Sequence, residues 1–191
     1  MEEDFHLAQG MIGSWSPGIG DPTLGGWITV CLYVVAVAAI WVLLRRTDFT
    51  HYEPERWVWR ILLLGLIVLG INKQLDLQTA LTELGRIFAH RQDWYDNRGQ
   101  VQQAFIAGTG ILGITSLVAL VFLAWGSHKA TLFALVGGGL LLMFVMMRAT
   151  SFHHLDRTLN AELAGFRYNW IIEMGGLAWV LASALWRRRI A

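Results

Sequence analysis

The sequence has 191 residues, of which 55% are hydrophobic and only 15% are charged, and its formal net charge is +1. A soluble domain carries roughly a quarter charged residues, so this composition indicates a membrane protein. The single cysteine excludes a disulfide framework and a cysteine-rich metal cluster, and the near-neutral charge gives no nucleic-acid-binding surface, so we expect no nucleic acid partner.

Residues 1–26 are predicted to form an extracytoplasmic tail of irregular structure, because its second half is rich in glycine and proline. Residues 27–191 are predicted to form a single transmembrane domain. A helix needs roughly 20 residues to cross a bilayer core about 30 Å thick. Apolar runs predict five such helices, at about 27–44, 57–76, 104–125, 130–147 and 168–186.

A further helix is predicted between the second and third spans. Leu77, Leu81, Leu84 and Phe88 recur at helical spacing, and polar residues occupy the opposite face. Such a stripe is typical of an amphipathic helix that lies on a membrane surface or caps a helix bundle. The expected fold is therefore an all-α membrane protein, a bundle of five transmembrane helices with an additional amphipathic helix on the extracytoplasmic side.

Five spans place the two termini on opposite sides of the membrane. We call the side of the N-terminus side A and the other side B. Side B carries seven lysines and arginines in short loops and at the C-terminus, whereas the seven of side A are spread over much longer segments. Short basic loops face the cytoplasm. We therefore expect a multi-pass protein of the plasma (inner) membrane, with its N-terminus outside and its C-terminus in the cytoplasm.

Polar residues gather at the side-A ends of the second, fourth and fifth spans. Glu173 lies inside an apolar stretch, where a carboxylate needs a partner or a polar interior. Asn72 and Asp76 are four residues apart, as are Asn169 and Glu173, so each pair shares a helix face. This polar layer consists of Asn72, Lys73, Asp76, Arg148, Ser151, His153, His154, Asp156, Asn169 and Glu173.

Three interpretations of the polar layer stay open at the level of the sequence. In the first, Lys73 and Arg148 neutralise Asp76 and Glu173 in a structural network that also includes Asn72, Ser151 and Asn169. In the second, a divalent ion such as zinc binds to ligands drawn from His153, His154, Asp156, Asp76 and Glu173. In the third, the layer binds a lipid, a quinone or another cofactor without chemistry.

Two functions follow from these interpretations. The leading hypothesis is a small integral membrane protein that acts by binding through the polar layer. It would be an accessory subunit of a membrane complex, with other membrane protein subunits as partners, or a lipid or cofactor binder. The alternative is a metal-dependent membrane hydrolase in which the bound ion activates water. Whether the chain is an enzyme, and which cofactor it holds, stay open at this point.

Overall fold

The computed structural model describes residues 15–76, 80, 84, 87, 98–150, 162–163 and 166–190. Within this part of the chain there are five long helices, α1 (Leu24–Arg46), α2 (Glu53–Leu75), α4 (Arg98–Leu123), α5 (Lys129–Thr150) and α7 (Tyr168–Arg189). Two short strands, β1 (Glu162–Leu163) and β2 (Phe166–Arg167), pair antiparallel just before α7. The prediction of an all-α protein with five long helices is confirmed, and each predicted span corresponds to one helix.

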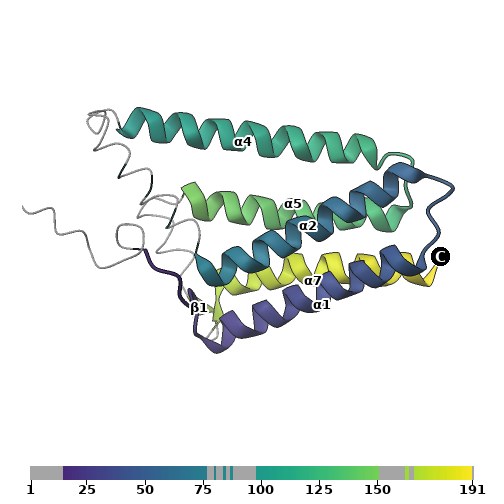
Figure 1. The fold of residues 1–191 in the computed structure, drawn as a ribbon, viewed down its shortest axis with the longest axis horizontal. Coiled ribbons are helices and arrows are strands. Elements are labelled where there is room, and N and C mark those ends of the chain that lie inside the picture. Colours follow the sequence, from purple (N-terminus) through teal and green to yellow (C-terminus); the bar gives the residue numbers. More distant parts are fainter. Residues whose placement is uncertain are drawn as a thin grey trace, which may run out of the picture.

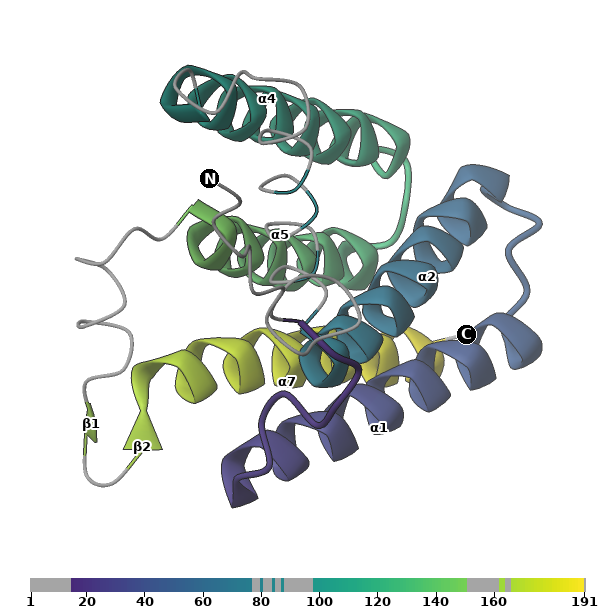
Figure 2. The same ribbon diagram turned by 60° about the vertical axis from the view of Figure 1, so that its left-hand side comes forward.

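The five helices run along the long axis of the molecule in alternating directions (Figure 1). Side A therefore holds the N-terminal ends of α1, α4 and α7, and side B holds their C-terminal ends. Figure 2 shows α4, α5, α7 and α1 in succession, while α2 packs against α1 and α5. In this arrangement α7 lies between α5 and α1, and α4 lies at the edge of the bundle.

The ends of the first two helices are fixed by local hydrogen bonds. Thr23 precedes α1, and its hydroxyl accepts a hydrogen bond of 3.1 Å from the backbone N–H of Gly26. This N-cap starts α1 three residues before the predicted span. Asp76 follows α2 with a left-handed φ of 46°, and its N–H donates to the carbonyl of Asn72. Asp76 is therefore the residue that ends α2.

The buried core joins four of the helices. Its apolar members are Tyr33, Ala36, Ile40 and Leu43 of α1, Val58, Trp59, Leu62 and Leu66 of α2, Ala134, Leu135 and Leu141 of α5, and Leu177, Val180 and Ala184 of α7. The described side chains of α4 that reach this core are only partly buried.

Helices α5 and α7 approach each other closely at two glycines. A Cβ atom on Gly137 would lie 2.8 Å from Val180, and one on Gly176 would lie 2.9 Å from Leu141. Small residues let helix backbones approach in this way within membranes. Gly137 and Gly176 are therefore points of close packing between α5 and α7.

Two helices of the described part, α1 and α2, are long and apolar enough to cross a membrane. The shorter apolar stretches Gly110–Leu123 and Lys129–Val145 lie within α4 and α5. These findings are consistent with a membrane protein. Of the predicted amphipathic helix between the second and third spans, Ala80, Leu84 and Ile87 are described and are helical, and the remainder lies outside the described residues.

Candidate functional site

Lys73 of α2 joins two carboxylates at the side-A end of the bundle. Its Nζ lies 3.1 Å from Glu173 Oε2 on α7 and 3.2 Å from Asp21 Oδ2, which precedes α1. The side chains of Lys73 and Glu173 are each 3% exposed, and that of Asp21 is 19% exposed. Charges are stable at such burial only when they are paired. The ammonium of Lys73 thus links α2, α7 and the segment before α1.

Further donors satisfy the two carboxylates. The Tyr33 hydroxyl on α1 donates to Glu173 Oε1 at 3.1 Å, and Trp170 Nε1 donates to Asp21 Oδ2 at 3.3 Å. The hydroxyl of Thr23 donates to the other oxygen of Asp21. We call Asp21, Thr23, Tyr33, Lys73, Trp170 and Glu173 the side-A cluster. Because its partners come from three helices, the cluster fixes α1, α2 and α7 to one another.

The pKa of the Asp21 carboxyl lies below its usual value of 3.8. Burial by itself raises this pKa, but the hydrogen bonds from Thr23, Lys73 and Trp170 and the charge of Lys73 outweigh the effect of burial. Asp21 is therefore ionised at neutral pH, and its negative charge faces the Lys73 ammonium.

Residues 15–23, the N-terminal strap, lie across the side-A end of α2. Trp15 Nε1 donates to the carbonyl of Leu75 at 3.0 Å, and the N–H of Gly20 donates to the carbonyl of Gln74 at 2.7 Å. A Cβ atom on Gly20 would lie 2.9 Å from the same carbonyl oxygen. The last carbonyls of a helix have no partner within the helix, and the strap supplies two of them with donors.

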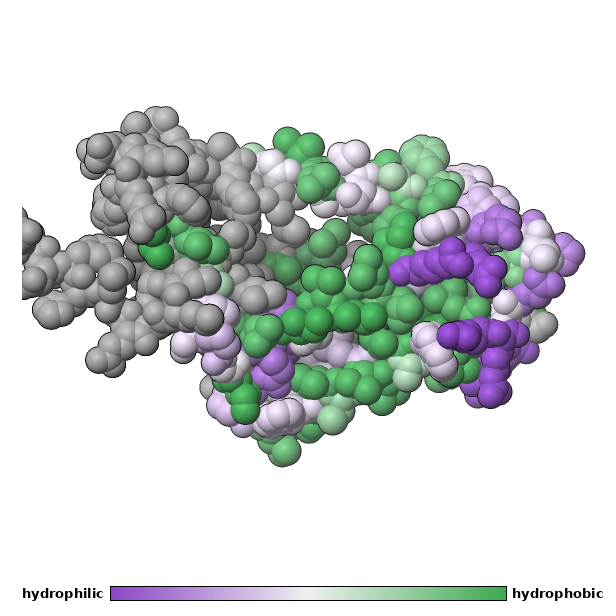
Figure 3. Space-filling model, in the orientation of Figure 1, coloured by the Kyte–Doolittle hydropathy of each residue, from purple (hydrophilic) through white to green (hydrophobic). Residues whose placement is uncertain are grey.

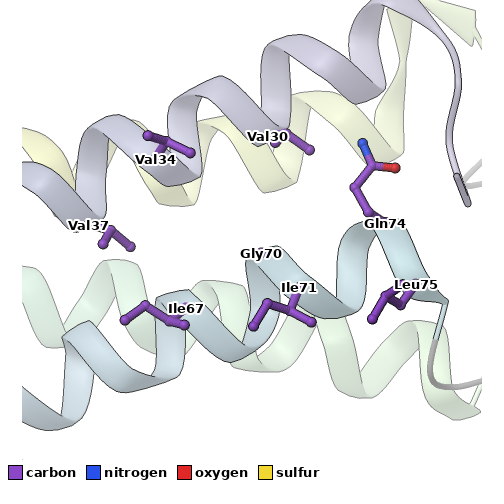
Figure 4. Close-up of a pocket in the computed structure, with 8 residues that line it drawn as sticks. All are labelled: Val30, Val34, Val37, Ile67, Gly70, Ile71, Gln74 and Leu75. Atoms are coloured by element: carbon purple, nitrogen blue, oxygen red, sulfur yellow. The ribbon is translucent and has the colours of Figure 1, made fainter.

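An apolar groove of about 450 Å³ lies between α1 and α2 beside the strap (Figure 4). It extends for about 12 Å along α2, at a rise of about 1.5 Å per residue. The nitrogen and oxygen of the Gln74 amide at its side-A end are buried and have no hydrogen-bond partner among the residues that the structure describes. The groove is lined by Val30, Val34, Val37, Ile67, Gly70, Ile71, Gln74 and Leu75.

A larger crevice, of about 600 Å³, separates α4 from α5. A Cβ atom on Gly110 would meet no atom within 4 Å, so Gly110 is not a point of close helix packing. The crevice is lined by Gly110, Gly113, Ile114, Leu117 and Val121 of α4 and by Leu132, Leu135, Val136, Gly139, Leu140, Leu142 and Met143 of α5.

A second charge cluster, not predicted from the sequence, closes the side-B end. Arg187 of α7 donates from Nε to Glu55 Oε1 at 2.7 Å and from a terminal nitrogen to Oε2 at 3.2 Å. The Thr131 hydroxyl of α5 donates to Glu55 Oε1 and accepts from Trp59 Nε1. We call Glu55, Trp59, Thr131 and Arg187 the side-B cluster; it ties α2, α5 and α7 together.

The structure brings together two members of the predicted polar layer, Lys73 and Glu173. Asp76 and Asn72 meet through the backbone hydrogen bond that ends α2. Arg148 and Asn169 lie in α5 and α7, but their side chains are outside the description.

Ser151, His153, His154 and Asp156 lie outside the described residues. Within the described part of the chain no group of three or more histidines, cysteines, aspartates and glutamates is placed to hold a metal ion. The metal site therefore stays a prediction, and it rests on residues 151–156.

Sequence reasoning missed four members of the side-A cluster, Asp21, Thr23, Tyr33 and Trp170. Two signals pointed to the first three. Asp21 and Thr23 flank a proline directly before an apolar run, which is the pattern of a capped helix start. Tyr33 carries a hydroxyl in the middle of an apolar span, where it needs a hydrogen-bond partner. Neither signal identifies the partner, because Glu173 is 140 residues from Tyr33.

Comparison of the chain with protein-family models, curated proteins and solved structures finds no match. Function is thus to be read from the residues themselves. In both charge clusters the ions are paired inside the bundle, which makes the clusters suited to holding helices together. The groove between α1 and α2 and the crevice between α4 and α5, in contrast, expose apolar side chains that another molecule can contact.

Proposed function

We propose that this chain is a small integral membrane protein whose five long helices all cross the bilayer, and that it acts by binding. In this proposal the crevice between α4 and α5 holds the hydrocarbon part of a lipid or a lipid-like cofactor. The observation that carries the proposal is the crevice itself, an apolar space of about 600 Å³ between two neighbouring helices. Small-molecule sites range from roughly 300 to 1,000 Å³.

The lengths and directions of the helices support five crossings. α4, α5 and α7 have 26, 22 and 22 residues, compared with 23 in both α1 and α2. At 1.5 Å per residue these helices are about 33 to 39 Å long, enough for a hydrocarbon core of about 30 Å. The five helices run along one common axis (Figure 1). A bilayer crossed by α1 and α2 would therefore also be crossed by the other three. The basic side-B loops favour a cytoplasmic C-terminus.

The crevice is elongated along its two helices. The lining residues extend over about 16 Å of each helix, at a rise of about 1.5 Å per residue. An elongated apolar space of this kind suits a hydrocarbon chain that lies parallel to α4 and α5.

The chemistry of the walls specifies which part of the ligand lies inside. All the lining residues are aliphatic, glycine or methionine, so a polar group buried there would lack a hydrogen-bond partner. Burial of hydrocarbon gains little inside a bilayer, where the surroundings are equally apolar. Affinity would come from van der Waals contact with a wall whose shape is fixed. The side-B cluster holds α5, one wall of the crevice, against α2 through the hydrogen bonds of the Thr131 hydroxyl.

Extraction of lipids from the purified protein tests this function. We expect an apolar molecule to copurify in stoichiometric amount, as detected by mass spectrometry of the organic extract. Gly110→Leu fills the crevice and should remove that molecule. Gly65→Leu is the matched control, because Gly65 is an exposed glycine of α2 with no atom within 4 Å of its Cβ position.

Two results would overturn the proposal. One is the absence of a stoichiometric apolar molecule from the extract of the wild-type protein. The other is equal retention in Gly110→Leu and Gly65→Leu. Copurification of membrane proteins in place of a lipid, unaffected by Gly110→Leu, would favour the role of an accessory subunit.

A further inference from the structure

The side-B end carries an excess of positive charge. Within the described part of the chain, Arg187 is the one cation of this end that has an ion-pair partner. The seven other lysines and arginines described at this end carry a charge of +7, and the exposed carboxylates of Asp48 and Glu53 reduce it to +5. Figure 3 shows hydrophilic side chains gathered at this end, next to a hydrophobic middle. The seven unpaired cations form the side-B basic surface: Arg45, Arg46, Arg56, Arg60, Lys129, Arg188 and Arg189.

Two of these arginines are held against tryptophan rings. The Cζ atom of Arg45 lies 4.9 Å from the centre of the Trp41 ring, and that of Arg60 lies 4.7 Å from the centre of the Trp57 ring. The two tryptophans are 51% and 55% exposed, so the pairs lie on the outside of the bundle. Exposed tryptophans of membrane proteins collect at the level of the lipid headgroups.

We propose that the side-B basic surface binds the phosphate groups of anionic phospholipids. A planar guanidinium can donate two hydrogen bonds to one phosphate, and stacking on a ring orients it for this contact. The acyl chains of the same lipid would lie along the exposed apolar flanks of α1 and α2, which include Val34 and Leu64 at 62% and 63% exposure.

A lipid fits this surface better than an acidic soluble protein. The arginine and tryptophan pairs lie on the flank of the bundle, where apolar side chains continue along the same helices. The inference rests on the insertion of α1 and α2 into a bilayer, which is part of the function proposed above. Carbonate extraction of membranes tests that insertion separately, so its failure can be distinguished from the failure of lipid selectivity.

Native mass spectrometry of the full chain in mild detergent tests the inference. The protein is titrated with phosphatidylglycerol and with phosphatidylcholine that carry identical acyl chains. We expect phosphatidylglycerol to bind at least tenfold more tightly. Arg45→Gln and Arg60→Gln should each lower its affinity about fivefold, the effect of one basic side chain near an anionic surface. Arg60→Lys keeps the charge but loses the bidentate geometry, and should lower the affinity by less than Arg60→Gln.

The matched control is Arg98→Gln, which removes one charge at the start of α4 on side A. It should leave the preference for phosphatidylglycerol unchanged, and thermal unfolding checks that each variant is folded. Equal affinities for the two lipids would overturn the inference, as would an equal loss in Arg98→Gln and Arg45→Gln. Complete displacement of phosphatidylglycerol by soluble glycerol phosphate would indicate a site for free phosphate esters. Copurification of an acidic protein that Arg45→Gln abolishes, without lipid selectivity, would assign the surface to that protein.

Discussion

Helices α7 and α4 have similar lengths, 22 and 26 residues, yet they are held in the bundle in different ways. α7 is bound by an ion pair at each end, Glu173 with Lys73 and Arg187 with Glu55, and it packs against α5 through Gly176. α4 contacts the bundle through partly buried apolar side chains, and Ile111, Ile114 and Phe122 are about two-thirds or more exposed.

In the membrane-spanning arrangement proposed above, the contrast concerns what holds helices together inside a bilayer. Lipid tails are as apolar as leucine side chains, so apolar contact alone gives little net attraction between helices. Close packing at small residues, hydrogen bonds and ion pairs provide the attraction. α7 has all three, whereas α4 is held in its described part by apolar contacts and by one hydrogen bond, from the Tyr52 hydroxyl to the Leu123 carbonyl at its side-B end. α7 is therefore the fixed element of the bundle, and α4 is the element that can leave room for a ligand.

The largest effect is expected from Lys73→Met, which leaves the buried Glu173 carboxylate and Asp21 without their cation. Removal of one partner from a buried ion pair costs about 3–5 kcal/mol of unfolding free energy. Unfolding in mixed micelles measures the loss. The double variant Lys73→Met/Glu173→Leu should recover part of it, because the most deeply buried carboxylate is then removed and only Asp21, which is 19% exposed, is left without its cation. Lys129→Met, at an exposed and unpaired lysine, is the control and should change stability by less than about 0.5 kcal/mol. A single variant as stable as this control would refute the role of the ion pair.

A smaller loss is expected when the side-B cluster is broken at Thr131. Thr131→Val keeps the volume of the side chain but removes the hydroxyl that bridges Trp59 and Glu55. A buried donor left without a partner costs about 1–3 kcal/mol. The same unfolding measurement gives the loss, and near-ultraviolet circular dichroism reports on the Trp59 ring. Thr50→Val, at an exposed threonine of the loop after α1, should have little effect. An equal effect of the two variants would contradict the bridging role.

A pair of alanine substitutions sharpens the comparison between the two helices. Gly176→Ala in α7 places a Cβ atom 2.9 Å from Leu141 and should destabilise the protein by about 1–3 kcal/mol through overpacking. Gly110→Ala in α4 has open space and should be neutral or stabilise by up to about 1 kcal/mol, since alanine favours helix. Opposite signs in thermal unfolding are the expected result. If Gly110→Ala destabilised the protein as much as Gly176→Ala, α4 would be packed as tightly as α7.

The smallest effect is expected on the binding of the N-terminal strap at low pH. The pKa of Asp21 is lower in the folded protein than its usual 3.8, so its pairing contributes fully to stability above that value and is lost as the pH falls through the lower folded pKa. The N-terminal strap should thus stay bound at pH 5 and begin to detach below about pH 3.8. Limited acid proteolysis with pepsin between pH 2 and 5 should detect cleavage within the strap. With cleavage normalised to that of an unfolded substrate at the same pH, Asp21→Asn should make strap cleavage independent of pH over this range, and an unchanged profile in this variant would exclude Asp21 as the titrating group.

The apolar runs predicted the five helices because the length of an apolar run and the length of a helix are both local properties. Contacts between residues far apart in the sequence could not be predicted in the same way. Asp21 reaches Lys73 only because the strap folds back over the end of α2, and a glycine-rich tail gives no sign of that path. Glu55 and Arg187 are 132 residues apart in the sequence. Both lie close to other arginines, which in the sequence indicated the cytoplasmic side of the membrane and gave no sign of an ion pair. Gly110 and Gly137 look alike in the sequence and differ only in what stands opposite them.

The position of Lys73 along the chain has a consequence for assembly. Its partner Asp21 comes 52 residues earlier, and its partner Glu173 comes 100 residues later. A chain made from its N-terminus therefore supplies Lys73 with a carboxylate while the later helices are still being synthesised. The last helix then meets an ammonium already held in place by the strap, and its glutamate completes the pair. Under the membrane insertion proposed above, we expect the strap to serve as the counter-ion of Lys73 until the last helix arrives.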